Sequence, residues 1–169
     1  MIECSEPDII VATETCLKPE IFTAELELDD YNVYRRDRPS GVGGGVMIAV
    51  HNSISSTEVS EEINGAEFIW TKILLSGHQQ LYVGACYRPN VITKTTTALL
   101  QASVEHILDN QHKNVILACD FNLPGWNWKE IELKPECLCP ANHLEFKEFI
   151  DNHGHWEQTE ESKPRVQSG

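Results

Sequence analysis

The chain has 169 residues, 41% of them hydrophobic and 23% charged, which is typical of one soluble globular domain and excludes an intrinsically disordered chain. No apolar run approaches the roughly 20 residues of a membrane-spanning helix, and the first residues lack the order of a signal peptide, so we expect an intracellular protein without a membrane partner. The formal net charge of -13 at pH 7 argues against a module that coats DNA with basic residues, although an acidic protein can act on phosphate esters if its carboxylates hold a divalent cation.

The first third of the chain predicts strands with polar connections between them. The expected strands cover residues 7–13, 31–34 and 46–50. Glu14 stands directly after the first strand, and residues 19–30 form a connection with one helical turn. The densest basic cluster of the chain lies before the third strand and consists of Arg35, Arg36 and Arg38. It is either a solvated run of charge or a contact for a phosphate backbone, and the glycine-rich run 41–45 behind it permits a tight turn.

Three more strands and a helix are expected in the middle of the chain. The strands cover residues 54–59, 66–75 and 80–87, and the helix covers residues 95–111. A hairpin turn at residues 76–78 joins the last two strands. Tyr87 and Arg88 stand where the third of these strands is ended by Pro89, so a phenol and a guanidinium at that rim could both bond a phosphate oxygen.

Residues 115–119 form an apolar run that we interpret as a strand buried on both faces, and a second helix is expected over residues 141–153. The strand ends in Asp120 and Asn122, a carboxylate and a carboxamide at a position where sheet proteins hold ligands and metals. The alternative is that both side chains only begin a turn by bonding their own backbone. Glu14 has the same alternative as a solvated loop residue, but two acidic strand ends in one small sheet protein favour a site.

The six cysteines do not predict a disulfide framework. No secretory signal accompanies them, so we expect reduced thiols. Cys137 and Cys139 precede His143, but a Cys-x-Cys run lacks the two-residue gap of zinc knuckles, and no second ligand pair with standard spacing follows. We therefore do not expect a zinc site here.

Four of the strand-end segments occur in the order and approximate spacing of one family. They are TETCL at 13–17, RRDRPSGVGGGV at 35–46, CYRPN at 86–90 and CDFN at 119–122. In this combination the chain resembles the endonuclease/exonuclease/phosphatase superfamily, most closely the apurinic-like endonuclease domain of non-LTR (LINE-type) retrotransposons. The resemblance covers nearly the whole chain. It implies an α/β fold, a four-layer α/β sandwich of two packed mixed sheets flanked by helices, as a single partial domain over residues 1–169.

The resemblance also implies a reaction, namely hydrolysis of DNA phosphodiesters with Mg²⁺ or Mn²⁺. Glu14 corresponds to the metal-binding glutamate of the family, and a hard dication prefers such carboxylate oxygens. Tyr87 matches the phosphate-contacting tyrosine and Asp120 the aspartate that orients or activates the attacking water. Asn122 matches the asparagine that helps hold the nucleophile and the transition state. Two arginines near these positions are predicted to bind the substrate, Arg38 and Arg88.

Both ends of the family pattern are missing from the sequence, so we expect a domain that is incomplete at both ends. Family domains begin with a strand that carries an asparagine near the metal, and they end with strands that carry an Asp and then a Ser-Asp-His motif. The run at 163–165 resembles the family's Pro-Thr-Arg corner without its Thr. We expect weak or no activity from these 169 residues, because removing one member of a cooperative catalytic set leaves little of the rate.

The sequence therefore predicts the DNA-nicking endonuclease domain of a retrotransposon-derived protein. Its partners would be DNA and a reverse transcriptase domain in the full-length protein, and it would be nuclear if it acts on chromosomal DNA. The alternative is a non-catalytic fragment or interaction module, which the sheet edges exposed by missing strands would favour. A phosphatase of the same superfamily is disfavoured by the YRP and GGGV segments.

Overall fold

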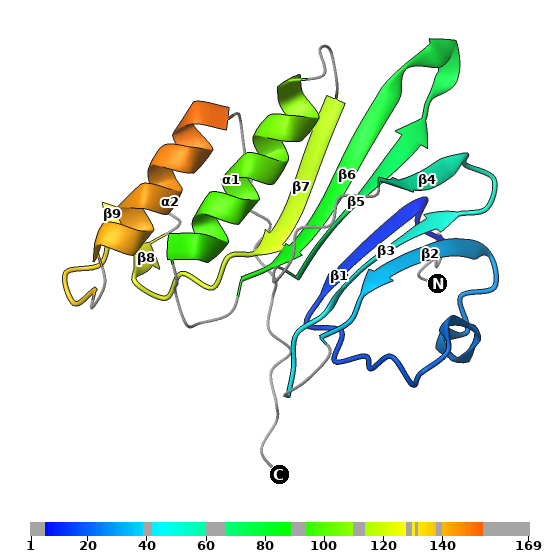
Figure 1. Cartoon of the computed structure of the whole chain (residues 1–169), viewed down its shortest axis with the longest axis horizontal. Coiled ribbons are helices and arrows are strands. Elements are labelled where there is room, and N and C mark those ends of the chain that lie inside the picture. The colour runs from blue at the N-terminus through cyan, green and yellow to red at the C-terminus, as the bar shows by residue number, and fades with distance from the viewer. Residues whose placement is uncertain are drawn as a thin grey trace, which may run out of the picture. The chain divides into compact units, whose positions relative to one another are not determined.

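The computed structural model describes residues 6–38, 42–59, 67–88, 94–109, 114–127, 130, 132–137 and 140–153. The chain forms two compact units, Met1–Asn122 and Leu123–Gly169. Together they contain two larger sheets, a two-stranded sheet and two α-helices, so the protein is a mixed α/β protein (Figure 1). The mixed α/β class agrees with the sequence, whereas the single domain over residues 1–169 stays a prediction.

Three antiparallel strands form the first sheet of the first unit, in the order β1-β3-β2. They are β1 (Ile9–Thr13), β2 (Tyr31–Arg36) and β3 (Val46–His51). The connection from β1 to β2 contains the single 3-10 turn η1 (Thr23–Leu26), in agreement with the one helical turn expected there. Val46 lies opposite both Thr13 and Arg36, so β1 and β2 end beside the start of β3.

Four strands form the second sheet, in the order β4-β5-β6-β7. They are β4 (Ser56–Val59), β5 (Glu67–Leu74), β6 (Gln80–Tyr87) and β7 (Asn114–Asp120). The short 3-10 turn η2 (Ser76–His78) joins β5 to β6, as the hairpin signal predicts. Helix α1 (Lys94–Asp109) connects β6 to β7, and a crossover of this kind makes the two strands parallel. Their last residues, Tyr87 and Asp120, therefore lie side by side.

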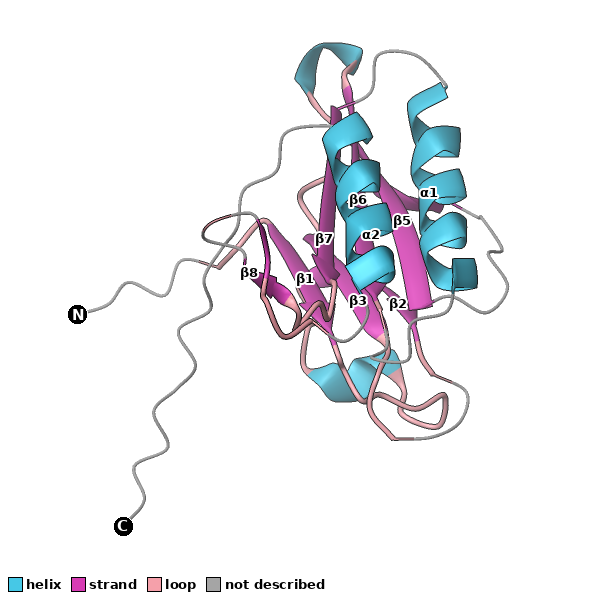
Figure 2. Cartoon of the chain, turned by 90° about the vertical axis from the view of Figure 1, so that its left-hand side faces the viewer, coloured by secondary structure: helices cyan, strands magenta, loops and turns pink. Residues whose placement is uncertain are grey.

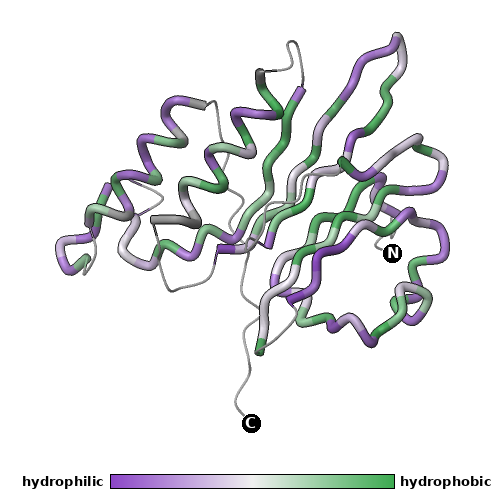
Figure 3. The backbone as a smooth tube through the Cα atoms, in the orientation of Figure 1, coloured by the Kyte–Doolittle hydropathy of each residue, from purple (hydrophilic) through white to green (hydrophobic). Residues whose placement is uncertain are grey.

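The two sheets of the first unit share one apolar core. Its buried members come from β3, β5 and β6: Val46, Ile48, Val50, Ile69, Ile73, Val83, Ala85 and Tyr87. In Figure 3 hydrophobic residues follow one another along β3, whereas hydrophobic and hydrophilic residues alternate along α1. Val46, Ile48, Ala49 and Val50 of β3 are all fully buried. A helix with one apolar stripe covers a sheet on that side only.

Helix α1 packs on the other face of the second sheet. Side chains alternate between the faces of a strand, so Trp70 points away from the core that Ile69 enters. The Trp70 Nε1–H donates to Ser103 Oγ of α1 at 2.9 Å. Gly84 lies opposite Trp70 on β6, and a Cβ at that position would collide with the indole ring. Figures 1 and 2 show α1 running alongside the strands of this sheet.

The second unit contains helix α2 (Pro140–His153) and a short antiparallel pair, β8 (Trp126–Asn127) and β9 (Glu132–Leu133). Phe146 and Phe149 on α2 are buried, with ring centroids 5.8 Å apart. The helix agrees with the predicted range 141–153, whereas the sequence does not predict the two-residue strands. Neither α1 nor α2 has the length and apolar composition needed to cross a membrane.

The predicted burial of the strand at 115–119 is wrong. Ile116 is 53% exposed, and the other residues of this run are half-buried. Among the described residues β7 pairs only with β6, so it is an edge strand. An apolar run has the same appearance in a central strand and in an edge strand, which explains the error.

The prediction that all cysteines are reduced is also wrong, because Cys86 and Cys119 form a disulfide. The parallel register of β6 and β7 places these residues directly opposite one another, with Cα atoms 4.6 Å apart. That distance lies within the range that a disulfide can bridge. Of the other cysteines, the structure describes Cys16 and Cys137 as free thiols.

Replacing both Cys86 and Cys119 by serine is expected to lower the free energy of unfolding by about 2–4 kcal/mol, because the bond closes a loop in the unfolded chain. The measurement is urea denaturation without reductant, with Cys16→Ser as the matched control. Thiol titration of the denatured wild type should find two thiols fewer than after reduction. A wild type with all its thiols free would contradict the disulfide.

Candidate active site

Three predicted site residues meet where β1, β6 and β7 end. Glu14 follows β1, Tyr87 is the last residue of β6 and Asp120 is the last residue of β7. The Tyr87 hydroxyl donates a hydrogen bond to Glu14 Oε1 at 2.7 Å. Asp120 lies opposite Tyr87 in the parallel register. Residues from three segments far apart in the sequence are thus brought to one edge of the first unit.

The backbone at Glu14 and at Asn122 has a conformation that few residues other than glycine adopt. Their φ angles are 51° and 49°, in the left-handed region. Residues other than glycine are uncommon there, and those that do occur are often found at functional sites. The Asn122 N–H donates to Asp120 Oδ1 at 3.1 Å. Asp120 therefore does begin a turn, which was the alternative interpretation, but this bond uses only one carboxylate oxygen. Among the described residues, none bonds the second oxygen.

The environment of Tyr87 favours its protonated form. Its pKa is raised above the ordinary value of 10.0, first because the hydroxyl donates to Glu14, then because of burial and the negative charge of Glu14. The charge of Asp120 also raises the pKa, and only Arg38 lowers it. Tyr87 is 8% exposed, so water screens these charges weakly. At neutral pH this phenol is a hydrogen-bond donor.

Arg38 lies beside Tyr87 and is held by other groups. Its Cζ lies 5.5 Å from the centroid of the Tyr87 ring, a distance at which a cation is attracted to a ring face. Its Nε–H donates to Glu67 Oε1 at 2.6 Å, and its Nη1–H donates to the carbonyl of Val42 at 2.9 Å. The bond to Glu67 raises the pKa of Arg38 further. The basic cluster is therefore not a fully solvated run of charge, at least at this residue.

Glu67 is the residue of this region that the sequence did not point to. It begins β5, opposite Tyr87 in the antiparallel register of β5 and β6. Its second oxygen, Oε2, accepts the N–H of Gly45 at 2.5 Å. A glutamate at the start of a strand belongs to no motif. Its partners lie 29 and 22 residues away in the sequence, so no local signal could have identified it.

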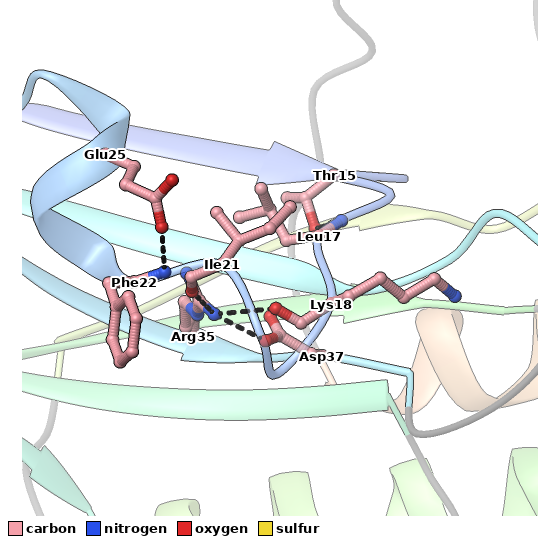
Figure 4. Close-up of polar contacts among 8 residues, drawn as sticks. All are labelled: Thr15, Leu17, Lys18, Ile21, Phe22, Glu25, Arg35 and Asp37. Atoms are coloured by element: carbon pink, nitrogen blue, oxygen red, sulfur yellow. Dashed lines mark hydrogen bonds and ion pairs between the residues drawn. The ribbon is translucent and has the colours of Figure 1, made fainter.

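Arg35 fixes the segment that follows Glu14 (Figure 4). Its Nη2 donates to the carbonyls of Lys18 at 3.1 Å and Ile21 at 2.5 Å, and to Asp37 Oδ2 at 2.8 Å. The Arg35 and Asp37 side chains are 13% and 9% exposed, so the ion pair is largely withdrawn from water. The connection between β1 and β2 is thereby tied to the end of β2.

Arg88 lies almost fully buried, with 2% of its surface exposed. Its backbone N–H donates to the carbonyl of Asp120 at 3.1 Å, and its Nη1–H donates to the carbonyl of Phe121 at 3.0 Å. Arg88 therefore holds the backbone that leads from Asp120 to Asn122. The substrate contact proposed for it stays a prediction, and the neighbouring Pro89 and Asn90 lie outside the described residues.

The described residues contain no group of three His, Cys, Asp or Glu side chains that could enclose a metal ion. The donors fit only an open site. Glu14 is exposed, and one of its oxygens accepts the Tyr87 hydroxyl while no described residue bonds the other. Mg²⁺ is commonly held by one or two carboxylates, by waters and by phosphates of the substrate. Glu14 therefore fits a Mg²⁺ or Mn²⁺ site that the substrate would complete.

His143 in the second unit does not have the arrangement of a zinc ligand. Its Nε2 accepts the N–H of Gly125 at 3.3 Å, and its Nδ1 lies 3.6 Å from Cys137 Sγ. A neutral imidazole whose Nε2 accepts carries its proton on Nδ1, so neither nitrogen has a lone pair left for a metal. Cys139 lies outside the described residues.

No model of a protein family matches the chain, and no curated protein sequence matches it. Among solved structures, the chain is similar to the AP endonuclease LMAP from Leishmania major, with a TM-score of 0.66 and 14% identity over 87% of this chain and 57% of that one. It is similar to the endonuclease domain of TRAS1, a telomere-specific non-LTR retrotransposon, with a TM-score of 0.55 and 12% identity over 74% and 53% of the two chains. An AP endonuclease from Archaeoglobus fulgidus gives 0.50 and 16% over 86% and 60%.

The chain thus spans between 53% and 60% of the length of these three structures. At such low identity the likeness is one of fold. The chain shares its fold with two AP endonucleases and a retrotransposon endonuclease domain, which is the fold that the predicted resemblance implies. The retrotransposon branch and the catalytic roles of the site residues stay predictions.

Glu14→Gln is expected to lower the pKa of Tyr87, because a neutral amide replaces the carboxylate that accepts the hydroxyl and opposes the phenolate. The raised pKa has a consequence for the wild type. The Tyr87 contribution to the free energy of unfolding is complete below the unfolded value of 10.0 and is lost as the pH rises through the folded pKa.

Titration of the Tyr87 ring by NMR measures this pKa. The exposed Glu20 on the same connection gives the matched control Glu20→Gln. An unchanged Tyr87 pKa in Glu14→Gln would show that the two side chains do not interact in solution.

Proposed function

We propose that the chain is the DNA-nicking endonuclease domain of a retrotransposon-derived protein, a metal-dependent phosphodiester hydrolase. The observation that carries the proposal is the meeting of Glu14, Tyr87 and Asp120 at three strand ends. The fold likeness to two AP endonucleases and to a retrotransposon endonuclease domain supports it. We further propose that the complete domain is a four-layer sandwich, with helices outside both sheets, and that it acts in the nucleus alongside a reverse transcriptase domain.

A divalent cation held by Glu14 would neutralise charge on the phosphate and polarise one of its oxygens. The remaining roles belong to side chains of the protein. Asp120 would orient and deprotonate the attacking water through the carboxylate oxygen that the turn leaves available. Tyr87, kept protonated by its surroundings, would turn its single O–H from Glu14 to a phosphate oxygen when the substrate binds, and the carboxamide of Asn122 would donate beside it.

Arg38 would place its guanidinium against the phosphate backbone of the DNA. Its position over Tyr87 brings the positive charge to the side of the site where the phenol donates. Arginine bonds phosphate oxygens in a fixed planar geometry, which makes it suited to orient a backbone. Arg88 would act mainly on the backbone of the Asp120–Asn122 turn and only through it on the substrate.

DNA binding that is strengthened by Mg²⁺ is the expected result for the wild type. Glu14→Gln should remove this Mg²⁺-dependent part, so that its affinity for DNA is the same with Mg²⁺ as in EDTA. Fluorescence anisotropy of a labelled duplex oligonucleotide in Mg²⁺ and in EDTA measures it, with Glu20→Gln as the matched control. Equal affinity with and without Mg²⁺, or an effect of Glu20→Gln as large as that of Glu14→Gln, would contradict the proposal.

Nicking of supercoiled plasmid by these 169 residues is expected to be slow or absent, because the sequence contains no Ser-Asp-His segment. The assay uses protein in excess over plasmid with Mg²⁺, and Asp120→Ala identifies any nicking that belongs to this site. Rapid nicking that Asp120→Ala abolishes would support the endonuclease but overturn the expectation of weak activity. A non-catalytic interaction module on the same scaffold remains the second candidate, and the exposed edge strand β7 favours it.

A further inference from the structure

We propose that Glu67 is the positioning residue of this site. In our proposal its carboxylate fixes Arg38 beside Tyr87 and at the same time fixes the glycine segment 43–45, which holds the backbone after Glu14. The inference rests on the proposed function for what these residues would bind. The arrangement itself is a property of the protein without substrate, so it can be tested without DNA.

Both oxygens of the Glu67 carboxylate have donors. Oε1 accepts the Arg38 Nε–H at 2.6 Å and Oε2 accepts the Gly45 N–H at 2.5 Å. The side chain is only 16% exposed, so these bonds replace most of its contact with water. Hydrogen bonds to an ionised group are about twice as strong as neutral ones. One carboxylate therefore joins a side chain from the end of β2 to the backbone at the start of β3.

The glycine segment accepts this carboxylate because it has no side chains. Gly44 and Gly45 have φ angles of 76° and 85°. A Cβ on Gly44 would collide with the Arg38 guanidinium and the Glu67 carboxylate, and a Cβ on Gly45 would lie 2.6 Å from Thr15 Oγ1. The GGG run, which resembles a family motif, thus has a physical reason in this chain. Gly44 makes room for the Arg38–Glu67 pair, and Gly45 makes room for the Thr15 side chain.

The same glycines hold the segment that carries Glu14. The carbonyl of Gly45 accepts the N–H of Thr15 at 3.3 Å, and the carbonyl of Gly44 accepts the N–H of Cys16 at 2.9 Å. Since Glu14 has a left-handed backbone conformation, its direction depends on what restrains the residues after it. A continuous series of bonds therefore leads from Glu67 through Gly45 to the backbone beside Glu14.

The charge of Glu67 also affects the electrostatic attraction of the site for a phosphate. Paired with Arg38, the Glu67 carboxylate adds no net charge to that of Glu14 and Asp120 at the place where DNA would lie. If Arg38 were removed, an unpaired carboxylate would face the phosphate and repel it. Arg38→Ala should therefore weaken DNA binding more than Arg38→Ala combined with Glu67→Gln, although Glu67→Gln by itself weakens binding.

Amide hydrogen exchange tests the arrangement without DNA. In Glu67→Gln the amides of Gly45, Thr15 and Cys16 should exchange roughly tenfold faster or more, because the bond to a charged acceptor is lost. The matched control is Glu58→Gln. The Glu58 side chain is 44% exposed, and its carboxylate lies 3.7 Å from Arg36 Nη2. Unchanged exchange at Gly45 in Glu67→Gln would overturn the inference. If that variant does not fold, the wild-type Gly45 amide proton shift should follow the titration of the Glu67 carboxyl carbon, and independent titration would overturn it.

Measurements of DNA binding then distinguish a failure of this inference from a failure of the proposed function. Anisotropy of the same labelled duplex is measured for the wild type, Arg38→Ala, Glu67→Gln and the double variant. Tighter binding by the double variant than by Arg38→Ala supports the positioning role, and additive losses contradict it. If exchange at Gly45 depends on Glu67 but the wild type does not bind DNA, the positioning role stands and the proposed function fails.

Discussion

The hydrogen bond from the Tyr87 hydroxyl to the Glu14 carboxylate joins the two sheets of the first unit at the edge where β1 and β6 both end. It depends on the shared core, because Tyr87 is itself a core residue whose ring packs with Val46 and Ala85 while its hydroxyl reaches the rim. The packing of the sheets thus sets the distance between the two side chains. The position of the Glu14–Tyr87 pair at the polar edge is thus fixed by the apolar core beneath it.

The charges around the site explain how an acidic chain can be suited to a phosphate ester. Each arginine of the basic cluster faces a carboxylate: Arg35 faces Asp37, Arg36 faces Glu58 and Arg38 faces Glu67. With its arginines paired in this way and a net charge of -13, the chain has little of the excess positive charge that attracts DNA without regard to sequence. A cation at Glu14 would supply the missing attraction at the place of reaction. In the proposed function, affinity for DNA would therefore depend on the site rather than on the whole surface.

The sequence was sufficient for the strands and helices of the first unit and for the residues at the ends of β1, β6 and β7. Those strands are apolar runs that stop abruptly at Glu14, Tyr87 and Asp120, and such a pattern is local. Three features could not be predicted, because they depend on which strands become neighbours. The edge position of β7 and the Cys86–Cys119 bond follow from sheet order and register, and the contacts of Glu67 with Arg38 and Gly45 follow from the packing of one sheet on the other. The sequence of these segments alone does not determine which strands become neighbours.

Paramagnetic broadening by Mn²⁺ tests whether the strand ends of the first unit form a single open cation and phosphate site. At substoichiometric Mn²⁺ the amide signals of Glu14, Tyr87 and Asp120 should broaden first, and Glu14→Gln should abolish this selectivity. Signals of the acidic residues on η1 and β4, such as Glu25 and Glu58, should persist. Broadening that spreads evenly over the acidic surface, or that begins away from these strand ends, would contradict the account.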